Sequence, residues 1–378
     1  MGKIVDVLFV FVAIIMLSGC SGKEASVSYA DLQEIQWDSL ESGRIDMDSC
    51  VTFVKLETTD KCLVSDIKKI VVDDSLIFVM DDKEYVYEFD VNGNFIRQIG
   101  KKGHASSEYV QLLDFYLDKK SDAVYLYDVT KGIRKYDYEG NFISSISVET
   151  CYPCIRQVEF VDSTHILTCN AILSEYPFSY SLIDIYENEC VNFLQQIIVS
   201  DVSVTTQPGF VSIKKGLFFC ADMSDTIYTL RDNEVVPRYV LNTPGKHARK
   251  EYFSQFGDSE YFEAMRYAKE NGFSRGIDCM LMTDEFIFLR KEIKDSVYFV
   301  LYDYETKKGI KWELTFDKDG FLWTRAVASS ETSFVGWISS DDYLELMKET
   351  GVYDTLTEEE RNSIFMGNPY VFFISPEK

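Results

Sequence analysis

The chain has 378 residues, of which 46% are hydrophobic and 15% aromatic, and its formal net charge at pH 7 is −24. A negative field of this size repels nucleic acid and anionic lipid surfaces, so it argues against a nucleic-acid partner. The chain exceeds the length that one hydrophobic core usually supports, yet nothing after residue 27 has the composition of a linker. A single large domain is compatible with these features if it is built as a closed repeat.

The first 19 residues have the pattern of an export signal peptide. An apolar run from Val7 to Leu17 follows Lys3, and the small residues Ser18 and Gly19 precede Cys20. A helix over that run would rise about 16 Å, too short to cross a hydrocarbon core of about 30 Å. The segment 17–20 (Leu-Ser-Gly-Cys) resembles the lipobox of bacterial lipoproteins, which implies cleavage before Cys20 and acylation of its thiol.

This N-terminus predicts how the rest of the chain is organised. We expect a signal peptide over 1–19, a lipidated tether and lead-in over 20–49, and one folded domain over 50–378. Ser21 follows the cysteine where an aspartate would hold a lipoprotein at the inner membrane. We therefore expect anchoring to outer-membrane lipid through Cys20, on either the periplasmic or the cell-surface face.

A repeat follows the lead-in. Segments 77–99 and 124–146 align without a gap at an offset of 47, so that Asp81 falls on Asp128 and Asp90 on Asp137. Gly-Asn-Phe-Ile occurs in both copies, and each copy alternates short strand patterns with polar turns. A period near 47 with several short strands is typical of a propeller blade. We expect Asp81 and Asp128 to accept hydrogen bonds from the backbone of their own turns.

Weaker copies extend the repeat to the C-terminus. They cover 166–186, 217–230 and 286–302, and a last one combines 334–338 with 369–374. The strand pattern at 51–56 precedes the first copy and is expected to complete the last blade, because closing the ring removes exposed sheet edges. The prediction is an all-β, six-bladed β-propeller with helical insertions near 247–272 and 341–365.

The repeated Asp-x₈-Asp-x₂-Gly-Asn-Phe-Ile pattern, the segment 103–109 and the terminal Asn-Pro-Tyr-Val-Phe-Phe-Ile at 368–374 carry a family resemblance. They resemble six-bladed β-propeller lipoproteins of anaerobic Gram-negative gut bacteria, which are akin to NHL-repeat and TolB-like propellers. Members of that group usually carry Gly-x-Gly-Pro-Gly-Glu-Tyr between blades, whereas 103–109 reads Gly-His-Ala-Ser-Ser-Glu-Tyr. The resemblance implies a fold and a location, and it implies little about activity.

Few residues stand out as candidates for a site. His104, Glu108 and Tyr109 lie in the inter-blade segment and are the candidates for binding at a loop face. The histidines are far apart, and no zinc, calcium, nucleotide or nucleophile motif is present, so we predict no catalytic residues, metal or cofactor.

The cysteines other than Cys20 suggest packing more than chemistry. Cys169 and Cys220 lie in apolar strand patterns, where a free cysteine behaves as a small hydrophobe. Cys151 and Cys154 have the spacing of a redox pair but follow a β repeat instead of opening a helix. They are interpreted as a loop disulfide or a free pair.

Three functional hypotheses remain open. The first is a membrane-anchored, extracytoplasmic binding module that presents a loop face to an envelope protein, a peptide or a glycan, and that is more an interaction protein than an enzyme. The second is an exported hydrolase or lyase whose active site lies at the propeller axis. The third is a structural scaffold of the cell envelope.

Overall fold

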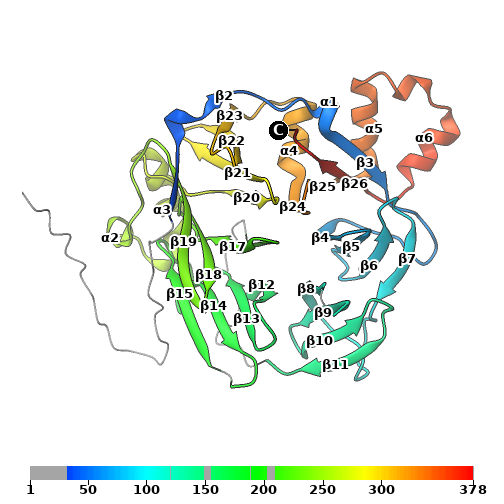
Figure 1. Ribbon diagram of the computed structural model, residues 1–378, viewed down its shortest axis with the longest axis horizontal. Helices are drawn as coiled ribbons and strands as arrows, with labels where there is room; N and C mark the ends of the chain where they lie inside the picture. The colour runs from blue at the N-terminus through cyan, green and yellow to red at the C-terminus, as the bar shows by residue number, and fades with distance from the viewer. Residues whose placement is uncertain (1–31, 120, 149–154, 188, 202–208, 378) are drawn as a thin grey trace, which may run out of the picture.

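The computed structural model describes residues 32–119, 121–148, 155–187, 189–201 and 209–377. Their strands form six sheets arranged as a ring around a central axis (Figure 1). The six-bladed β-propeller predicted from the repeat is therefore confirmed. Cys20, Cys151 and Cys154 lie outside the described residues.

Blades 1 to 3 each contain four antiparallel strands, which follow one another in chain order from the axis outward. Blade 1 consists of β4 (Ile67–Asp73), β5 (Leu76–Asp81), β6 (Val86–Asp90) and β7 (Phe95–Ile99). Blade 2 consists of β8 (Leu112–Asp118), β9 (Ala123–Asp128), β10 (Gly132–Asp137) and β11 (Phe142–Ile146). Blade 3 consists of β12 (Ile155–Phe160), β13 (His165–Asn170), β14 (Phe178–Asp184) and β15 (Cys190–Gln195).

Blades 4 to 6 also receive strands from the N-terminal part of the chain. Blade 4 consists of β16 (Phe210–Ile213), β17 (Gly216–Cys220), β18 (Thr226–Arg231), β19 (Glu234–Asn242) and β1 (Gln33–Gln36). Blade 5 consists of β20 (Cys279–Met282), β21 (Phe286–Ile293), β22 (Ser296–Asp303), β23 (Gly309–Glu313) and β2 (Glu41–Ser42). Blade 6 consists of β24 (Ala326–Ser329), β25 (Phe334–Ile338), β26 (Tyr370–Ile374) and β3 (Val51–Lys55).

The core lies between neighbouring blades, which explains why central strands are apolar on both faces. In β5, Ile77 and Val79 pack toward blade 6, whereas Phe78 and Met80 pack toward blade 2. Successive side chains of a strand point to opposite faces, so a strand between two blades reads as a continuous apolar run.

The repeated polar residues fix the turns, as expected. The Asp81 carboxylate accepts a hydrogen bond from the Tyr85 N–H at 2.9 Å, and the Asp128 carboxylate accepts one from the Thr130 N–H at 2.8 Å. Gly93 and Gly140 follow the third strands of blades 1 and 2 with φ of 84° and 81°. Only glycine adopts that left-handed backbone at little cost.

The ring closes in blade 6 as predicted. β3 pairs antiparallel with β26, with Val51 opposite Ile374 and Lys55 opposite Tyr370. Buried Asn368 secures the junction: its amide donates to the carbonyls of Glu57 and Cys62, at 2.7 and 3.0 Å. The N-terminal strand β3 and the C-terminal strand β26 thus lie side by side in one blade, which closes the ring.

Part of the segment 20–49, which we expected to be a tether and lead-in before the propeller domain, adds fifth strands to two blades. β1 pairs in parallel with β19, and β2 pairs in parallel with β23. Ile35 in β1, and Trp37 and Leu40 in the segment between β1 and β2, are buried. The 3₁₀ turn η1 (Trp37–Ser39) joins the two strands. We call residues 33–50 the strap, because they cross from blade 4 to blade 6 around the outside of blade 5.

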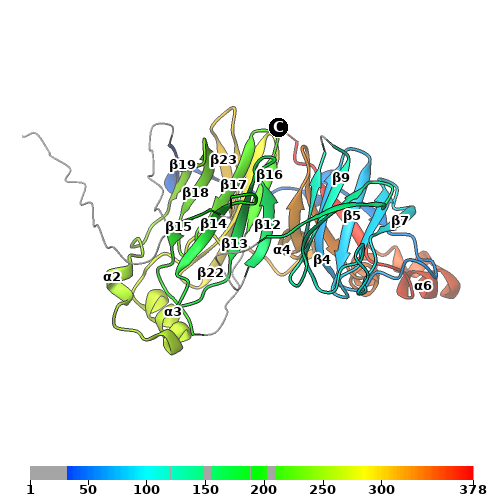
Figure 2. The ribbon, with the colours of Figure 1, turned by 90° about the horizontal axis from the view of Figure 1, so that it is seen from below.

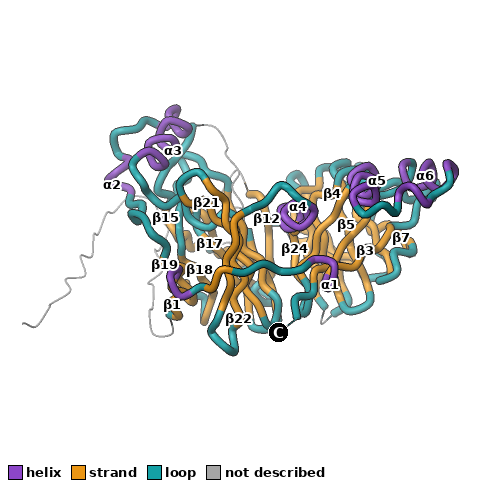
Figure 3. The backbone as a smooth tube through the Cα atoms, turned by 90° about the horizontal axis from the view of Figure 1, so that it is seen from above, coloured by secondary structure: helices purple, strands orange, loops and turns teal. Residues whose placement is uncertain are grey.

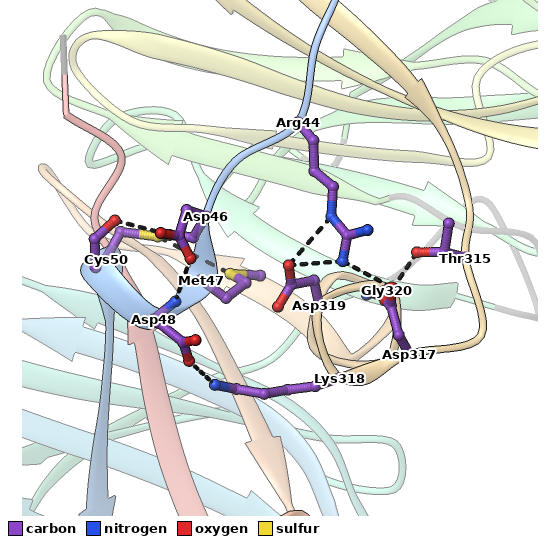
Figure 4. Close-up of polar contacts among 11 residues, drawn as sticks. Arg44, Asp46, Met47, Asp48, Cys50, Thr315, Asp317, Lys318, Asp319 and Gly320 are labelled. Carbon is purple, nitrogen blue, oxygen red and sulfur yellow. Dashed lines mark hydrogen bonds and ion pairs between the residues drawn. The ribbon is translucent and has the colours of Figure 1, made fainter. Parts of the chain in front are cut away.

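The far end of the strap is held by charged side chains (Figure 4). Arg44 donates to the carboxylates of Asp317 and Asp319, each at 2.7 Å. Lys318 pairs with Asp48, which lies in the first turn of α1 (Met47–Cys50). Arg44 and Asp317 are both 43% exposed, so their ion pair contributes little to stability.

The helices lie mostly at one end of the ring. They are α2 (Lys250–Phe253), α3 (Tyr261–Glu270), α4 (Lys318–Arg325), α5 (Ser340–Glu349) and α6 (Glu358–Phe365), with the 3₁₀ turns η2 (Asp258–Glu260) and η3 (Tyr353–Thr355). The insertions predicted near 247–272 and 341–365 are confirmed, whereas α4 was not predicted. No helix among the described residues is long and apolar enough to span a membrane.

The strand order explains why these helices share an end. In a four-stranded antiparallel blade, the connections to the next blade and the turns between the second and third strands lie together. α2, α3 and α4 occupy blade-to-blade connections, and α5 and α6 occupy a second-to-third turn. Figures 2 and 3 show these helices along one side of the disc. We call this side the helix face and the opposite side the hairpin face.

Candidate functional site

A cavity of about 1740 Å³ lies at the axis of the ring. Residues from all six inner strands, β4, β8, β12, β16, β20 and β24, contribute to its lining. Ligand pockets for small molecules usually measure about 300–1,000 Å³. The axial cavity is therefore large enough for a ligand of several units.

Bulges recur where the inner strands begin, at the helix-face end of the cavity. The register shifts after the first residue of β4, β8, β12 and β24. A bulge inserts an unpaired residue and redirects side chains, and such bulges are common beside binding sites. In β4 the unpaired residue is Lys68, which is exposed and lines the cavity.

Asp114 joins three blades near the axis. One carboxylate oxygen lies 2.7 Å from the Lys69 Nζ of β4, and the other accepts the Val158 N–H of β12 at 2.9 Å. Lys69 also donates to the Phe115 carbonyl at 2.7 Å. Asp114 is only 2% exposed, and these partners satisfy its buried charge.

Glu159 of β12 lies in the cavity wall beside this group. Burial raises its pKa from 4.5 to about 7; the negative charge of Asp114 adds to the rise, whereas Lys69 and a hydrogen bond with Ser212 oppose it. A carboxyl with this pKa exchanges its proton near neutral pH. It is the one lining carboxyl whose pKa is raised in this way among the described residues.

Aromatic rings form part of the wall between blades 2 and 3. The centre of the Phe160 ring lies 4.5 Å from that of Tyr125 and 5.4 Å from that of Tyr116. Lys135 Nζ lies 5.0 Å from the centre of the Tyr125 ring. Tyr186, which also lines the cavity, is 68% exposed. These rings give the cavity flat apolar surfaces in addition to its polar groups.

Charges in the lining are distributed unevenly. The lining residues with charged side chains are Lys68, Lys69, Lys119, Lys135, Lys214, Arg290, Asp118, Glu159, Asp162 and Glu331. Cations therefore outnumber carboxylates by six to four, although carboxylates outnumber cations by 62 to 38 in the whole chain. The cavity is a local exception to the negative charge of the molecule.

The segment with the predicted candidates His104, Glu108 and Tyr109 lies at the helix face, between β7 and β8. His104 is exposed, and the Glu108 carboxylate accepts the Ala105 N–H at 2.9 Å. Tyr109 corrects our expectation of a surface residue: its side chain is fully buried among the apolar residues of blades 1 and 2. Binding by His104 and Glu108 stays a prediction, and Tyr109 acts as a core residue.

The histidines do not converge on the cavity. None of the described residues that line it is a histidine. His165 lies on blade 3 with its Nδ1 3.0 Å from a carboxylate oxygen of Asp162, and His104 and His247 lie on different inter-blade connections. The described residues also contain no cluster of ligands suited to a metal ion.

The cysteines support the packing interpretation in part. Cys50, Cys62, Cys169, Cys220 and Cys279 are free and buried. Burial raises the pKa of the Cys50 thiol to about 11 and that of Cys62 to about 12, so these thiols are not reactive thiolates. Cys190, by contrast, is disulfide-bonded.

Sequence reasoning did not find Lys68, Asp114, Glu159 or Arg290. Each comes from a different blade, and no spacing in the chain connects them. For Lys68, Asp114 and Glu159, the signal that was available is the repeat itself, because equivalent positions of the inner strands must meet at the axis. Arg290 lies on β21, the second strand of blade 5, and had no such signal.

Comparison with solved structures agrees with this fold. A protein of Bacteroides fragilis NCTC 9343 whose export is inferred has 18% identity and a TM-score of 0.69, with 92% of this chain and 100% of that chain covered. A DUF4221 family member from Bacteroides vulgatus ATCC 8482 is less similar, with 11% identity, a TM-score of 0.48 and coverage of 86% and 98%. No curated protein matches the chain.

A family profile gives the assignment that these structures leave open. It matches residues 42–368, from the strap to the ring-closing asparagine, and so includes strands of all six blades, although β1 and β26 lie outside it. The chain therefore belongs to the family described as "Domain of unknown function (DUF4934)".

Proposed function

We propose that this protein is an extracytoplasmic binding module, anchored to the outer membrane through acylated Cys20, that receives a ligand in its axial cavity from the helix face. The observation that carries the proposal is the cavity of about 1740 Å³, whose lining is richer in cations than the chain as a whole. A pocket with apolar walls and a few placed polar groups is the usual form of a ligand site.

Location outside the cytoplasm has independent support. The solved structure with a TM-score of 0.69 is of a protein whose export is inferred. The disulfide at Cys190 is typical of proteins that fold in an oxidising compartment. The segment 17–20 supplies the attachment chemistry, with the Cys20 thiol as the group that takes the lipid.

A hydrolase or lyase is the second candidate because of Glu159. A carboxyl with a pKa of about 7 inside a cavity is suited to general acid or base catalysis near neutral pH. The lining offers no histidine or metal cluster to act with it among the described residues, which favours binding over turnover.

The test is to crosslink intact outer membranes, purify the lipidated protein and identify what is attached by mass spectrometry. A stoichiometric adduct that is released unchanged supports the binding module. If the released ligand is chemically altered by wild-type protein but not by Glu159→Gln, the hydrolase or lyase is favoured instead. If no adduct forms at any crosslinker length, the proposal fails.

A further inference from the structure

The helical insertion of blade 6 projects from the rim of the ring (Figure 1). It occupies residues 339–369, between β25 and β26, and contains α5, η3 and α6. Leu346 of α5 lies in the core between blades 5 and 6, and the ring of Tyr343 stacks on that of Tyr370 with centres 3.8 Å apart. α6, by contrast, has no buried residue. The insertion therefore holds α6 out at the surface of the molecule.

The inner and outer sides of α6 differ in what they contact. On the inner side, Ile364 packs against the core between blades 5 and 6, and the Arg361 guanidinium carbon lies 4.2 Å from the centre of the Tyr353 ring. Helical spacing places residues 358, 359, 362, 365 and 366 together on the outer side. Phe365 and Met366 on that side are 56% and 75% exposed. Two large apolar side chains thus face solvent at the end of an exposed helix.

Leu63 adds a third apolar side chain from a distant part of the chain. It lies in the connection between β3 and β4 and is 58% exposed. The next residue, Val64, donates its N–H to the side chain of Asn368 at 2.9 Å, and Asn368 follows Met366 by two residues. We call Leu63, Phe365 and Met366 the rim patch, because they lie around this one junction. Exposed apolar side chains that gather in this way mark interaction sites more often than single ones do.

The surroundings of the rim patch are acidic. Residues 339–368 contain eight carboxylates and two cations, and the connection over 57–66 adds three carboxylates and one lysine. Both cations of the insertion lie against its own Tyr353, with Lys348 Nζ 5.0 Å and the Arg361 guanidinium carbon 4.2 Å from the ring centre. Glu358 and Glu359, on the outer side of α6, are exposed and form no ion pair with any residue that the structure describes.

This charge argues against several occupants of the rim patch. A second copy carries the same net charge of −24, and a symmetric contact would oppose two acidic insertions. Anionic lipid is repelled too, and helices that lie in a membrane surface usually carry Lys and Arg beside their apolar side. The segment 21–31 has one lysine against two carboxylates, so it is not complementary either. The complementary occupant is a cationic protein surface.

We propose that the rim patch docks a partner protein whose surface has basic side chains around an apolar pocket. Phe365 and Met366 enter the pocket, and Glu358 and Glu359 pair with the basic side chains around it. Aromatic residues and methionine are enriched in the centres of protein interfaces, and an exposed helix that offers them to a groove is a recurring mode of recognition. The carboxylates around the patch attract a cationic partner and set its orientation.

This partner differs from the ligand of the axial cavity. Inner strands begin at the helix face, where Lys68 is the second residue of β4 and Arg290 lies opposite Cys279, the first residue of β20. Arg290 has Asp278 as an electrostatic partner, whereas the carboxylates of the lining belong to the hairpin-face half. Those carboxylates are Asp118, Glu159, Asp162 and Glu331. The helix face thus combines the cationic end of the cavity at the axis with an acidic apolar patch at the rim.

The experiment first places p-benzoylphenylalanine at Phe365 of the full-length protein in intact cells. After irradiation, mass spectrometry of the purified adduct identifies the partner and the crosslinked peptide. We expect a protein adduct whose crosslinked peptide carries lysine or arginine beside apolar residues. The partner is then purified, and its affinity for the detergent-purified full-length protein is measured at low and high salt.

Phe365→Ser combined with Met366→Ser should weaken that affinity about 10- to 100-fold, as expected for the loss of an apolar anchor. Phe262→Ser is the matched control, because Phe262 is 74% exposed on α3, across the ring from α6 (Figure 1). It should leave the affinity unchanged.

Glu358→Lys combined with Glu359→Lys should slow association and reduce its dependence on salt. Glu263→Lys combined with Glu270→Lys makes the same change of charge on α3 and should have little effect. The two glutamates of α6 are exposed, so this pair keeps the test valid if the serine variants fail to fold.

Four results would overturn the inference. Phe365 could yield a lipid, a second copy of this chain or no adduct. The crosslinked peptide could be acidic. Phe262→Ser could weaken the affinity as much as the two serine substitutions on α6 do. The glutamate-to-lysine pair on α6 could leave the association rate and its salt dependence unchanged.

Discussion

Glu159 and Asp114 show how the contacts of single residues determine the charge in the wall of the axial cavity. Both carboxyls lie near Lys69, but Asp114 contacts its ammonium directly and also accepts a backbone N–H, whereas Glu159 has a hydrogen bond with Ser212. Desolvation therefore dominates at Glu159 and raises its pKa to about 7. Two carboxyls in one wall thus serve different purposes, one structural and one able to change its charge.

Glu159→Gln should make the protein less sensitive to pH. Because the pKa of Glu159 is higher in the folded chain than its ordinary 4.5, the folded state binds this proton more tightly than the unfolded state. The contribution of this group to the free energy of unfolding is complete below about pH 4.5 and is lost as the pH rises through about 7. At pH 8 the variant should be more stable than the wild type by up to roughly 3 kcal/mol.

Urea unfolding at pH 5 and pH 8 measures this difference. Glu234→Gln, an exposed position on β19, controls for the removal of one negative charge. A Glu159→Gln variant whose stability changes with pH as much as that of the wild type would show that folding does not raise the pKa of the Glu159 carboxyl.

At the scale of elements, the strap and the ring closure distribute the N-terminal residues over three blades. Trp37 packs its ring at 5.3 Å from Tyr298 and lies in the core between blades 4 and 5, whereas Arg44 contacts aspartates at the surface. Apolar burial, more than the ion pairs of Figure 4, should therefore hold the strap to the propeller.

Trp37→Ala should destabilise the protein by about 3–5 kcal/mol, because it leaves a cavity under the strap. Arg44→Ala, which removes exposed ion pairs in the same strap, should cost less than about 1 kcal/mol. Guanidinium unfolding of both variants compares the two. Equal losses, or a Trp37→Ala loss below about 1 kcal/mol, would mean that the strap is not held by its buried residues.

The elements that were predicted are those with a strong local pattern. Alternating strands, Gly-containing turns and the Thr357 N-terminus of α6, where Thr357 and Glu360 cap each other, are all visible in the chain. β1 and β2 were missed because they are four and two residues long and mostly polar. α4 was missed because it has only eight residues and carries Gly320 in its first turns. The charge asymmetry of the cavity depends on which blades meet, and one sequence does not reveal that.

At the scale of the whole molecule, the membrane anchor that we propose depends on one atom, the thiol sulfur of Cys20. Lipid chains each add about 0.8 kcal/mol of membrane affinity per buried CH₂. Cys20→Ser should therefore abolish labelling by a radioactive fatty acid and block cleavage by the lipoprotein peptidase. Labelling followed by gel electrophoresis tests both, and a variant that is still labelled would refute the anchor.

The helix face is the part of the molecule that we expect to meet the ligand. It carries the helices, the exposed His104 and the cationic end of the cavity, whereas the hairpin face presents short turns and paired charges. A photo-crosslinking amino acid can be placed on either face and captures a ligand of any chemical class.

The most direct test places p-benzoylphenylalanine at Lys68 and His104 on the helix face and, separately, at Thr306 in the β22–β23 turn of the hairpin face. Cells producing each variant are irradiated, and the adducts of the purified proteins are compared. We predict adducts of one ligand from the helix-face positions and none from Thr306. Adducts only from Thr306 would contradict the assignment of the binding site to the helix-face end of the axial cavity.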